Sequence, residues 1–180
     1  MRDYDFLKQQ KYFHVTVTYN VSSELKILNW LYVQKIIQKY ALEFEVEIQC
    51  LVMMDTHTHL IVKTINGSAQ PFSDSLQKHL KADESLENIC KPILNYSQYL
   101  NTYKYIYRNP VQAKLSRHVE DFEFSSLICI IGRGHLNLRV YDQIGLVHNP
   151  FQVLNWLNTS GPLKHSKLSW LESRSQNSLS

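Results

Sequence analysis

The chain has 180 residues, of which 44% are hydrophobic and 19% charged, and its formal net charge is +3. This composition predicts one globular domain with a hydrophobic core and argues against a disordered, fibrous or collagen-like chain. The small positive charge permits a polyanionic partner without requiring one. Three widely spaced cysteines, Cys50, Cys90 and Cys129, are typical of reduced thiols and not of a disulfide framework or a zinc cage. Because no signal peptide and no membrane span is recognisable, we expect a cytoplasmic protein.

The first predicted elements are a strand and a long helix. Residues 12–19 alternate apolar side chains with His and Thr, which is the period of a half-buried strand. Ser22 and Ser23 offer an N-cap for a helix that runs to about Leu42. Apolar residues recur in this helix every three or four positions and predict its core-facing stripe: Leu25, Leu28, Leu31, Tyr32, Ile36 and Tyr40.

Two strands are predicted next, at residues 44–54 and 56–64, with a short turn near Asp55 between them. The first strand begins as a strict alternation, which predicts that its apolar residues share one buried face: Phe44, Val46, Ile48 and Cys50. The short connection predicts that the two strands form a β-hairpin.

The remaining pattern is weaker. Residues 71–88 are polar and weakly helical, and a clearer helix runs from Tyr96 to Asn109, where Pro110 is expected to end or kink it. Residues 124–131 are predicted as a strand and residues 150–158 as a short helix that begins with proline. From about residue 164 the chain is rich in Ser, Lys and Asn, which predicts a weakly ordered tail.

This order of strands and helices favours an α+β, ferredoxin-like fold, in which an antiparallel sheet has helices packed on one face. We therefore expect a single domain over residues 1–160 and a flexible tail over residues 161–180. No phosphate-binding loop, dinucleotide-binding turn or nucleophile elbow occurs in the sequence, so P-loop hydrolysis and α/β-hydrolase chemistry lose their usual support.

A metal site is the first chemical hypothesis. His57 and His59 are two residues apart in a predicted strand, so their side chains point to the same face and can hold one divalent ion. The alternative is a chance pairing among the eight histidines of the chain.

The helix at residues 96–109 is unusually rich in tyrosine. One side of it carries an apolar and aromatic stripe, which is more typical of a core than of an active site: Tyr96, Tyr99, Leu100, Tyr103, Ile106 and Tyr107. Tyr105 lies roughly opposite this stripe, on a polar face with Gln98, Asn101 and Asn109. A tyrosine beside an amide is a candidate nucleophile with a candidate ligand, and the alternative is an exposed tyrosine without a role.

Basic residues follow the tyrosines. Between Asn101 and Val119 the sequence has four basic residues and no acidic one: Lys104, Arg108, Lys114 and Arg117. Cations interleaved with aromatic rings suit a phosphate backbone with stacked bases, so these four are candidate DNA-binding residues. An ordinary solvated face is the alternative.

Taken in order, these segments resemble the REP-associated tyrosine transposases of the single-tyrosine branch of the HUH nuclease superfamily. The segments that carry the resemblance are His-Val-Thr at 14–16, LVMMDTHTHLIV at 51–62, Tyr-Leu at 99–100, YIYRNPVQA at 105–113 and Phe-Ser-Ser at 124–126. Together they cover roughly residues 12–130. The Asn-Pro-Val box at 109–111 is the most specific of them.

The resemblance implies a metal-dependent DNA nickase and rejoinase with a ferredoxin-like fold that cleaves single-stranded DNA near hairpins. It implies that Tyr105 attacks a phosphodiester to leave a 5′-phosphotyrosine, that His57 and His59 bind Mg²⁺ or Mn²⁺, and that Asn109 supplies a third ligand. The implied partner is single-stranded or hairpin DNA, the implied assembly a monomer or a homodimer, and the implied location a nucleoid-associated one in a bacterial cytoplasm.

Two further hypotheses stay open from the sequence. The sequence departs from the family pattern at Asp55, at Thr58 and before Lys91. These departures favour a second hypothesis, in which the protein binds single-stranded nucleic acid on the same fold but has lost cleavage. The third hypothesis is a metal-binding structural or regulatory protein unrelated to DNA. It accounts for His57 and His59 but leaves the Asn-Pro-Val box as a coincidence.

Overall fold

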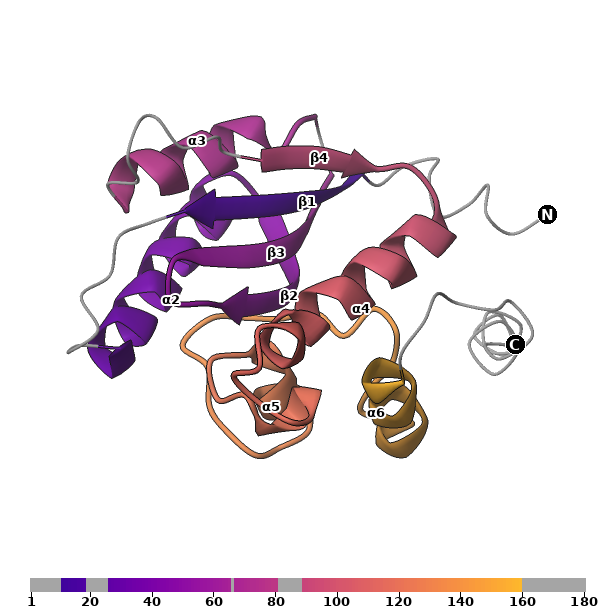
Figure 1. Cartoon of the computed structure of the whole chain (residues 1–180). Helices are drawn as coiled ribbons and strands as arrows, with labels where there is room; N and C mark the ends of the chain where they lie inside the picture. The colour runs from indigo at the N-terminus through magenta and orange to yellow at the C-terminus, as the bar shows by residue number, and fades with distance from the viewer. Residues whose placement is uncertain (1–10, 19–25, 66, 81–88, 160–180) are drawn as a thin grey trace.

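The computed structural model describes residues 11–18, 26–65, 67–80 and 89–159, and its elements form a β-α-β-β-α-β unit followed by further helices (Figure 1). In chain order the elements are β1 (Lys11–Thr18), α2 (Lys26–Glu43), β2 (Val46–Met53), β3 (His57–Thr64), α3 (Gln70–His79), β4 (Ile89–Ile93), α4 (Tyr96–Gln112), the 3₁₀ turn η2 (Val119–Asp121), α5 (Ser126–Ile130) and α6 (Pro150–Asn158). The predicted tail and the two proposed N-cap serines lie outside the described residues.

The four strands make one antiparallel sheet in the order β2-β3-β1-β4. This is the ferredoxin-like arrangement, so the predicted fold class is confirmed. The predicted hairpin is also confirmed, because β2 and β3 are neighbours. One detail was wrong: the register shifts between Ile48 and Cys50, and this bulge turns Cys50 to the opposite face from Val46 and Ile48.

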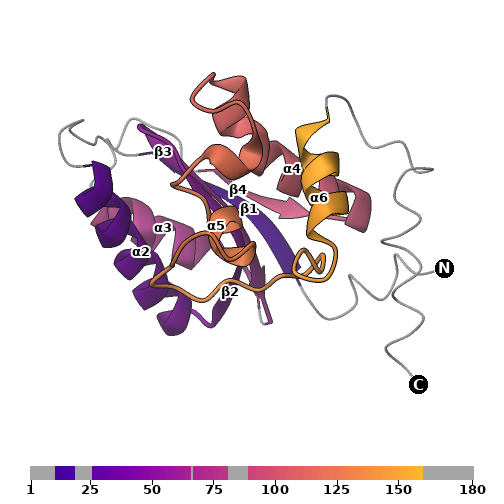
Figure 2. The ribbon, with the colours of Figure 1, turned by 90° about the horizontal axis from the view of Figure 1, so that it is seen from below.

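Each face of the sheet has its own hydrophobic core. One core joins the sheet to α2 and α3 through side chains such as Val15, Ile37 and Phe72. The other joins it to α4, α5 and α6 through side chains such as Ile61, Tyr103 and Leu157. Figure 2 shows α2 and α3 on one side of the sheet and α4 and α6 on the other. The prediction of helices on one face therefore describes the two crossover helices but not α4.

The weakly helical pattern predicted at residues 71–88 is confirmed over α3, whereas the last strand was assigned wrongly. In the structure the polar segment that begins at Gln70 forms α3, and β4 at Ile89–Ile93 completes the sheet. The predicted strand at 124–131 is instead the short helix α5, which Ser125 begins by accepting a hydrogen bond from the Leu127 backbone N–H at 3.1 Å. The predicted helix at 150–158 is confirmed as α6.

The helix faces were predicted with mixed success. In α2 the buried side is formed by Trp30, Val33 and Ile37, whereas Leu31 and Tyr32 of the predicted stripe are exposed. In α4 the predicted aromatic stripe is buried, as expected. This helix continues through Pro110 to Gln112 and does not end at Asn109. Pro110 has no N–H, so the helix loses only one backbone hydrogen bond there, and the packing of its buried side chains outweighs that loss.

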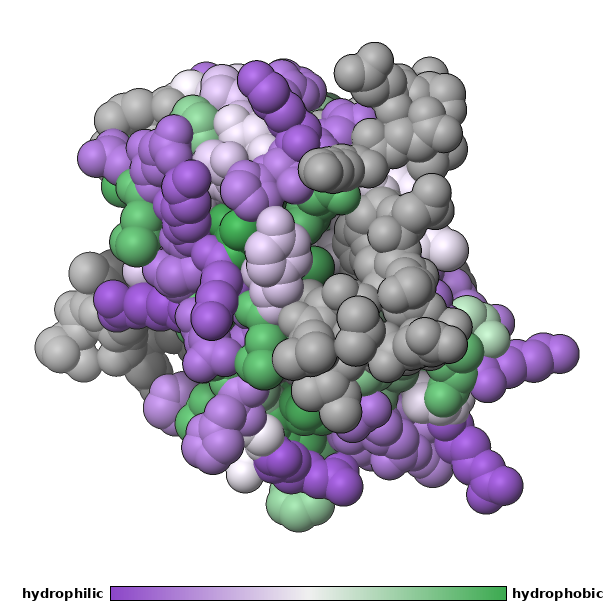
Figure 3. Space-filling view, turned by 90° about the vertical axis from the view of Figure 1, so that its left-hand side faces the viewer, coloured by the Kyte–Doolittle hydropathy of each residue, from purple (hydrophilic) through white to green (hydrophobic). Residues whose placement is uncertain are grey.

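After α5 the chain runs over the sheet edge and α2 before it reaches α6. Gln34 of α2 is fully buried and its side-chain oxygen accepts a bond from the Asn137 backbone N–H at 2.7 Å. Gln38 does the same for Arg139 at 3.0 Å. On the face drawn in Figure 3, hydrophilic side chains predominate among the described residues and hydrophobic ones form small separate areas. Within the described part of the chain, no helix is long and apolar enough to span a membrane.

Candidate active site

The two predicted metal-binding histidines lie side by side on the face of the sheet that α4 covers. His57 and His59 begin β3, and the centroids of their rings are 4.7 Å apart. His59 is only 5% exposed. The alternation of the strand therefore places both imidazoles on one face, as their spacing predicts.

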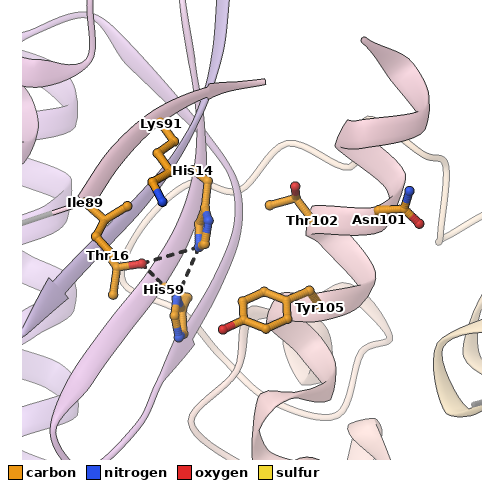
Figure 4. A pocket seen from close by; sticks show the side chains of 8 residues that line it. All are labelled: His14, Thr16, His59, Ile89, Lys91, Asn101, Thr102 and Tyr105. Atoms are coloured by element: carbon orange, nitrogen blue, oxygen red, sulfur yellow. Dashed lines mark hydrogen bonds between the residues drawn. The ribbon is translucent and has the colours of Figure 1, made fainter. Parts of the chain in front are cut away.

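A histidine and a threonine of the neighbouring strand join them. Thr16 of β1 is the register partner of His59, and its hydroxyl is hydrogen-bonded to Nδ1 of His59 at 3.0 Å. Nε2 of His14 lies 3.2 Å from the same Nδ1 and 3.4 Å from the Thr16 hydroxyl. Figure 4 shows this triangle of side chains at the foot of a pocket between the sheet and α4.

Tyr105 projects from α4 toward these histidines (Figure 4). Its ring centroid is 5.6 Å from that of His59 and 6.0 Å from that of His14. Tyr105 is 45% exposed, whereas Tyr103 and Tyr107 on either side are buried in the core. Among the tyrosines of α4, Tyr105 is therefore the one whose ring meets the histidines.

The histidines are uncharged at neutral pH. Burial, and secondarily Lys91, lowers the pKa of His14 to about 4. Burial, with His57 and His14 as further causes, lowers the pKa of His59 to about 3, and burial also lowers the pKa of His57. Neutral imidazoles have a free nitrogen lone pair, which is the form that binds a metal.

The histidine contacts fit a divalent metal. Nδ1 of His59 is engaged by Thr16, and Nδ1 of His57 is engaged by the Thr56 hydroxyl at 2.9 Å. With protons on both Nδ1 atoms, both Nε2 atoms keep their lone pairs for a metal. Among the described residues no three His, Cys, Asp or Glu side chains are grouped to hold a metal, so a metal here needs further ligands of another kind.

The amides of α4 lie on both sides of Tyr105. Asn109, the predicted third ligand, donates from Nδ2 to the backbone carbonyl of Tyr105 at 3.2 Å. Asn101, one turn before Tyr105, lines the pocket with His14 and His59, and Asn109 does not. The structure therefore brings Tyr105 into contact with His59, and Asn109 lies one turn further along α4, outside the lining of this pocket.

The four predicted DNA-binding cations fall into two pairs. Lys104 is buried, with its ammonium 3.3 Å from the Thr159 hydroxyl, and Arg108 donates to the backbone carbonyls of Leu157 and Thr159, both at 3.0 Å. These two side chains hold the end of α6 against α4. Lys114 and Arg117 are exposed at the surface.

Sequence reasoning did not assign a role to His14, Thr16 or Lys91. All three line the pocket, and Lys91 is the register partner of His14 on β4. One signal could have identified the first two: they are polar residues on one face of a strand whose other face is apolar from Phe13 to Val17. Lys91 had no such signal, because β4 itself was not predicted.

The sheet order and the helices on both of its faces define a ferredoxin-like domain. Its fold is similar to a solved structure of a REP-associated tyrosine transposase bound to a REP hairpin, with a TM-score of 0.53 and 22% sequence identity over 78% of this chain and 88% of that chain. No protein-family model and no curated protein matches the sequence. The predicted resemblance is thus confirmed at the level of the fold.

Proposed function

We propose that the protein is a metal-dependent DNA endonuclease and strand transferase that acts on single-stranded DNA near hairpins through Tyr105. The observation that carries this proposal is the contact of the exposed Tyr105 ring with His59, whose ring in turn meets that of His57. The similar structure, a transposase bound to a REP hairpin, supports hairpin DNA as the partner.

The proposed reaction is an exchange of one phosphodiester for another. The Tyr105 hydroxyl attacks the phosphorus, a bond forms from the phenol oxygen to phosphorus, and the bond from phosphorus to the 3′-oxygen breaks. The phenol proton passes to solvent and the departing 3′-oxygen takes up a proton. The products are a 5′-phosphotyrosine and a free 3′-hydroxyl, which can attack in the reverse direction to rejoin DNA without ATP.

In this proposal His57, His59 and Asn109 would hold Mg²⁺ or Mn²⁺. A divalent ion supplies stabilisation of the negative charge that develops on the phosphate. A phenol is a weak nucleophile at neutral pH because its ordinary pKa is about 10. The contribution of the chain itself is to place the Tyr105 hydroxyl beside the histidine pair and to keep those histidines neutral.

A covalent-trapping assay tests the proposal. Labelled hairpin oligonucleotides with single-stranded tails are incubated with the protein and Mn²⁺, and a denaturing gel separates covalent from non-covalent complexes. We expect a denaturant-resistant band that a chelator or Tyr105→Phe abolishes. Tyr32→Phe is the matched control, because Tyr32 is 49% exposed on α2, a helix on the opposite face of the sheet, and should leave the band unchanged.

Two outcomes would contradict the proposal. An adduct that survives Tyr105→Phe would exclude Tyr105 as the nucleophile. Intact hairpin binding without any adduct would instead indicate a nucleic-acid-binding module that has lost cleavage.

A further inference from the structure

A pocket of about 420 Å³ opens beside the candidate active site, between α4 and the edge of the sheet. Four elements line it: β1 and β3 contribute His14, Thr16 and His59, β4 contributes Ile89 and Lys91, and α4 contributes Asn101, Thr102 and Tyr105. Figure 4 shows the sheet residues on one side and Tyr105 and Thr102 on the other. Its volume lies within the range of small-molecule pockets, about 300–1,000 Å³.

The charge of this pocket favours an anion. None of the described residues that line it is an Asp or a Glu. Lys91 is exposed, and among the described residues no hydrogen bond or ion pair occupies its ammonium. Lys91 is the one Lys or Arg among the described residues that line this pocket.

The position of Lys91 is set by the sheet. Lys91 is paired with His14 across β1 and β4, so both side chains point to the face that α4 covers. The side chain of Lys91 lines the pocket, and Figure 4 shows it on the same side as His14 and Thr16. The cation is thus fixed on the same side of the sheet as Tyr105 but on a different strand from His57 and His59.

We propose that this pocket seats one nucleotide of the single-stranded DNA, with Lys91 binding the phosphate next to the one that Tyr105 attacks. The inference rests on the proposed function, because it names where the substrate lies. Asn101 and Thr102 offer a hydrogen-bonding edge to the base or sugar, and Ile89 offers an apolar surface. Phosphate binding by a lysine fixes the register of the strand without reading its sequence.

The test measures binding separately from cleavage. In a Tyr105→Phe background, the hairpin oligonucleotide that binds most tightly is titrated at several salt concentrations, with and without Lys91→Met. The logarithm of the binding constant falls linearly with the logarithm of the salt concentration. Loss of one phosphate contact should make this slope shallower by about 0.7 for a single strand. Lys11→Met is the matched control: Lys11 is an exposed cation of β1 on the opposite face, and its loss should leave the slope unchanged.

A scan with methylphosphonates locates the contact. Each oligonucleotide of the scan has one neutral linkage in place of a phosphate. We expect one position, within two nucleotides of the bond joined to Tyr105, at which neutralisation weakens binding several-fold in the parent and has no effect in Lys91→Met. Lys91→Arg should restore this sensitivity.

The outcomes separate the two proposals. A reduced slope without any covalent adduct would support Lys91 as a phosphate contact and would show that the proposed reaction is wrong. Equal slopes with and without Lys91→Met would overturn the proposed nucleotide pocket. If the covalent adduct still forms normally with Tyr105 present, the proposed reaction would remain supported. Failure to bind any oligonucleotide at low salt would overturn both.

Discussion

His14 and His59 face each other across β1 and β3, with Nε2 of the first 3.2 Å from Nδ1 of the second. The Thr16 hydroxyl closes the triangle at 3.0 Å from His59 and 3.4 Å from His14. One assignment of protons satisfies all three atoms: Nδ1–H of His59 donates to Thr16, and the Thr16 hydroxyl donates to His14. This assignment leaves Nε2 of His59 as an acceptor for a metal.

Thr16→Val is expected to weaken Mn²⁺ binding by about 10-fold or more, because hydrogen bonds that orient a metal-binding imidazole are worth about that much. Valine keeps the shape and strand preference of threonine but cannot receive the His59 proton. Calorimetric titration with Mn²⁺ measures the change. Thr102→Val makes the same substitution on the α4 side of the pocket and should leave the affinity unchanged; equal affinities for both variants would exclude the role of Thr16.

Asn109→Ala should weaken Mn²⁺ binding more than it weakens hairpin binding, because an amide oxygen is lost from the proposed ligand set while no charge changes. Nδ2 of Asn109 is engaged by the Tyr105 carbonyl, so the opposite amide oxygen keeps its lone pairs. Alanine is a strong helix former, so α4 is expected to persist. Asn101→Ala is the comparison in the same helix: if it lowers the Mn²⁺ affinity and Asn109→Ala does not, the ligand lies on the N-terminal side of Tyr105.

Arg108→Met is expected to lower the free energy of unfolding by about 1–2 kcal/mol, because two charge-assisted hydrogen bonds to the end of α6 are lost at a partly exposed site. Urea denaturation measures this change. Arg117→Met, at an exposed position, should change stability by less than about 0.5 kcal/mol and should instead lower the salt dependence of hairpin binding. If Arg108→Met instead lowered the salt dependence of hairpin binding and left stability unchanged, Arg108 would be a DNA-binding residue as the sequence predicted.

Stability is expected to fall as the pH rises above about 10. Burial raises the pKa of Tyr12 to about 12, and it raises the pKa values of Tyr103 and Tyr107 well above 10. Between pH 10 and 12 the unfolded chain loses phenol protons that the folded chain keeps, so each such group lowers the free energy of unfolding over that range. Thermal unfolding at pH 8, 9, 10 and 11 measures the loss. Tyr12→Phe should make the loss smaller, and an unchanged pH dependence in that variant would show that Tyr12 does not contribute.

The fold class could be predicted because alternation and helical periodicity are strong in β1, β2, β3 and α4. The prediction reached the right fold with the wrong last strand, since it placed that strand at residues 124–131 and did not recognise β4. Alternation could not identify β4, because a five-residue edge strand with Pro92 in it has a weak pattern. Periodicity also could not foresee the bulge at Gln49, since a bulge depends on the partner strand.

Within the site, the spacing of His57 and His59 fixed their common face, and the position of Tyr105 opposite the stripe of α4 fixed its exposure. Contacts between distant segments were beyond prediction. The sequence separates His14 from His59 by 45 positions, and only the strand register brings them together. For the same reason the charges of Lys104 and Arg108 were assigned to DNA, because nothing in the sequence places α6 beside them.

The two outer strands of the sheet determine how a second copy of the chain could associate. The backbone N–H of Tyr141 donates to the Ile48 carbonyl on the free side of β2, so the chain itself already occupies part of that edge. At the other edge Pro92 has no N–H to offer a further strand. A continuous intermolecular sheet is therefore disfavoured at both ends. Between the described parts of two copies, contacts through helices and loops are therefore favoured over extension of the sheet, and the same two edges disfavour edge-to-edge aggregation.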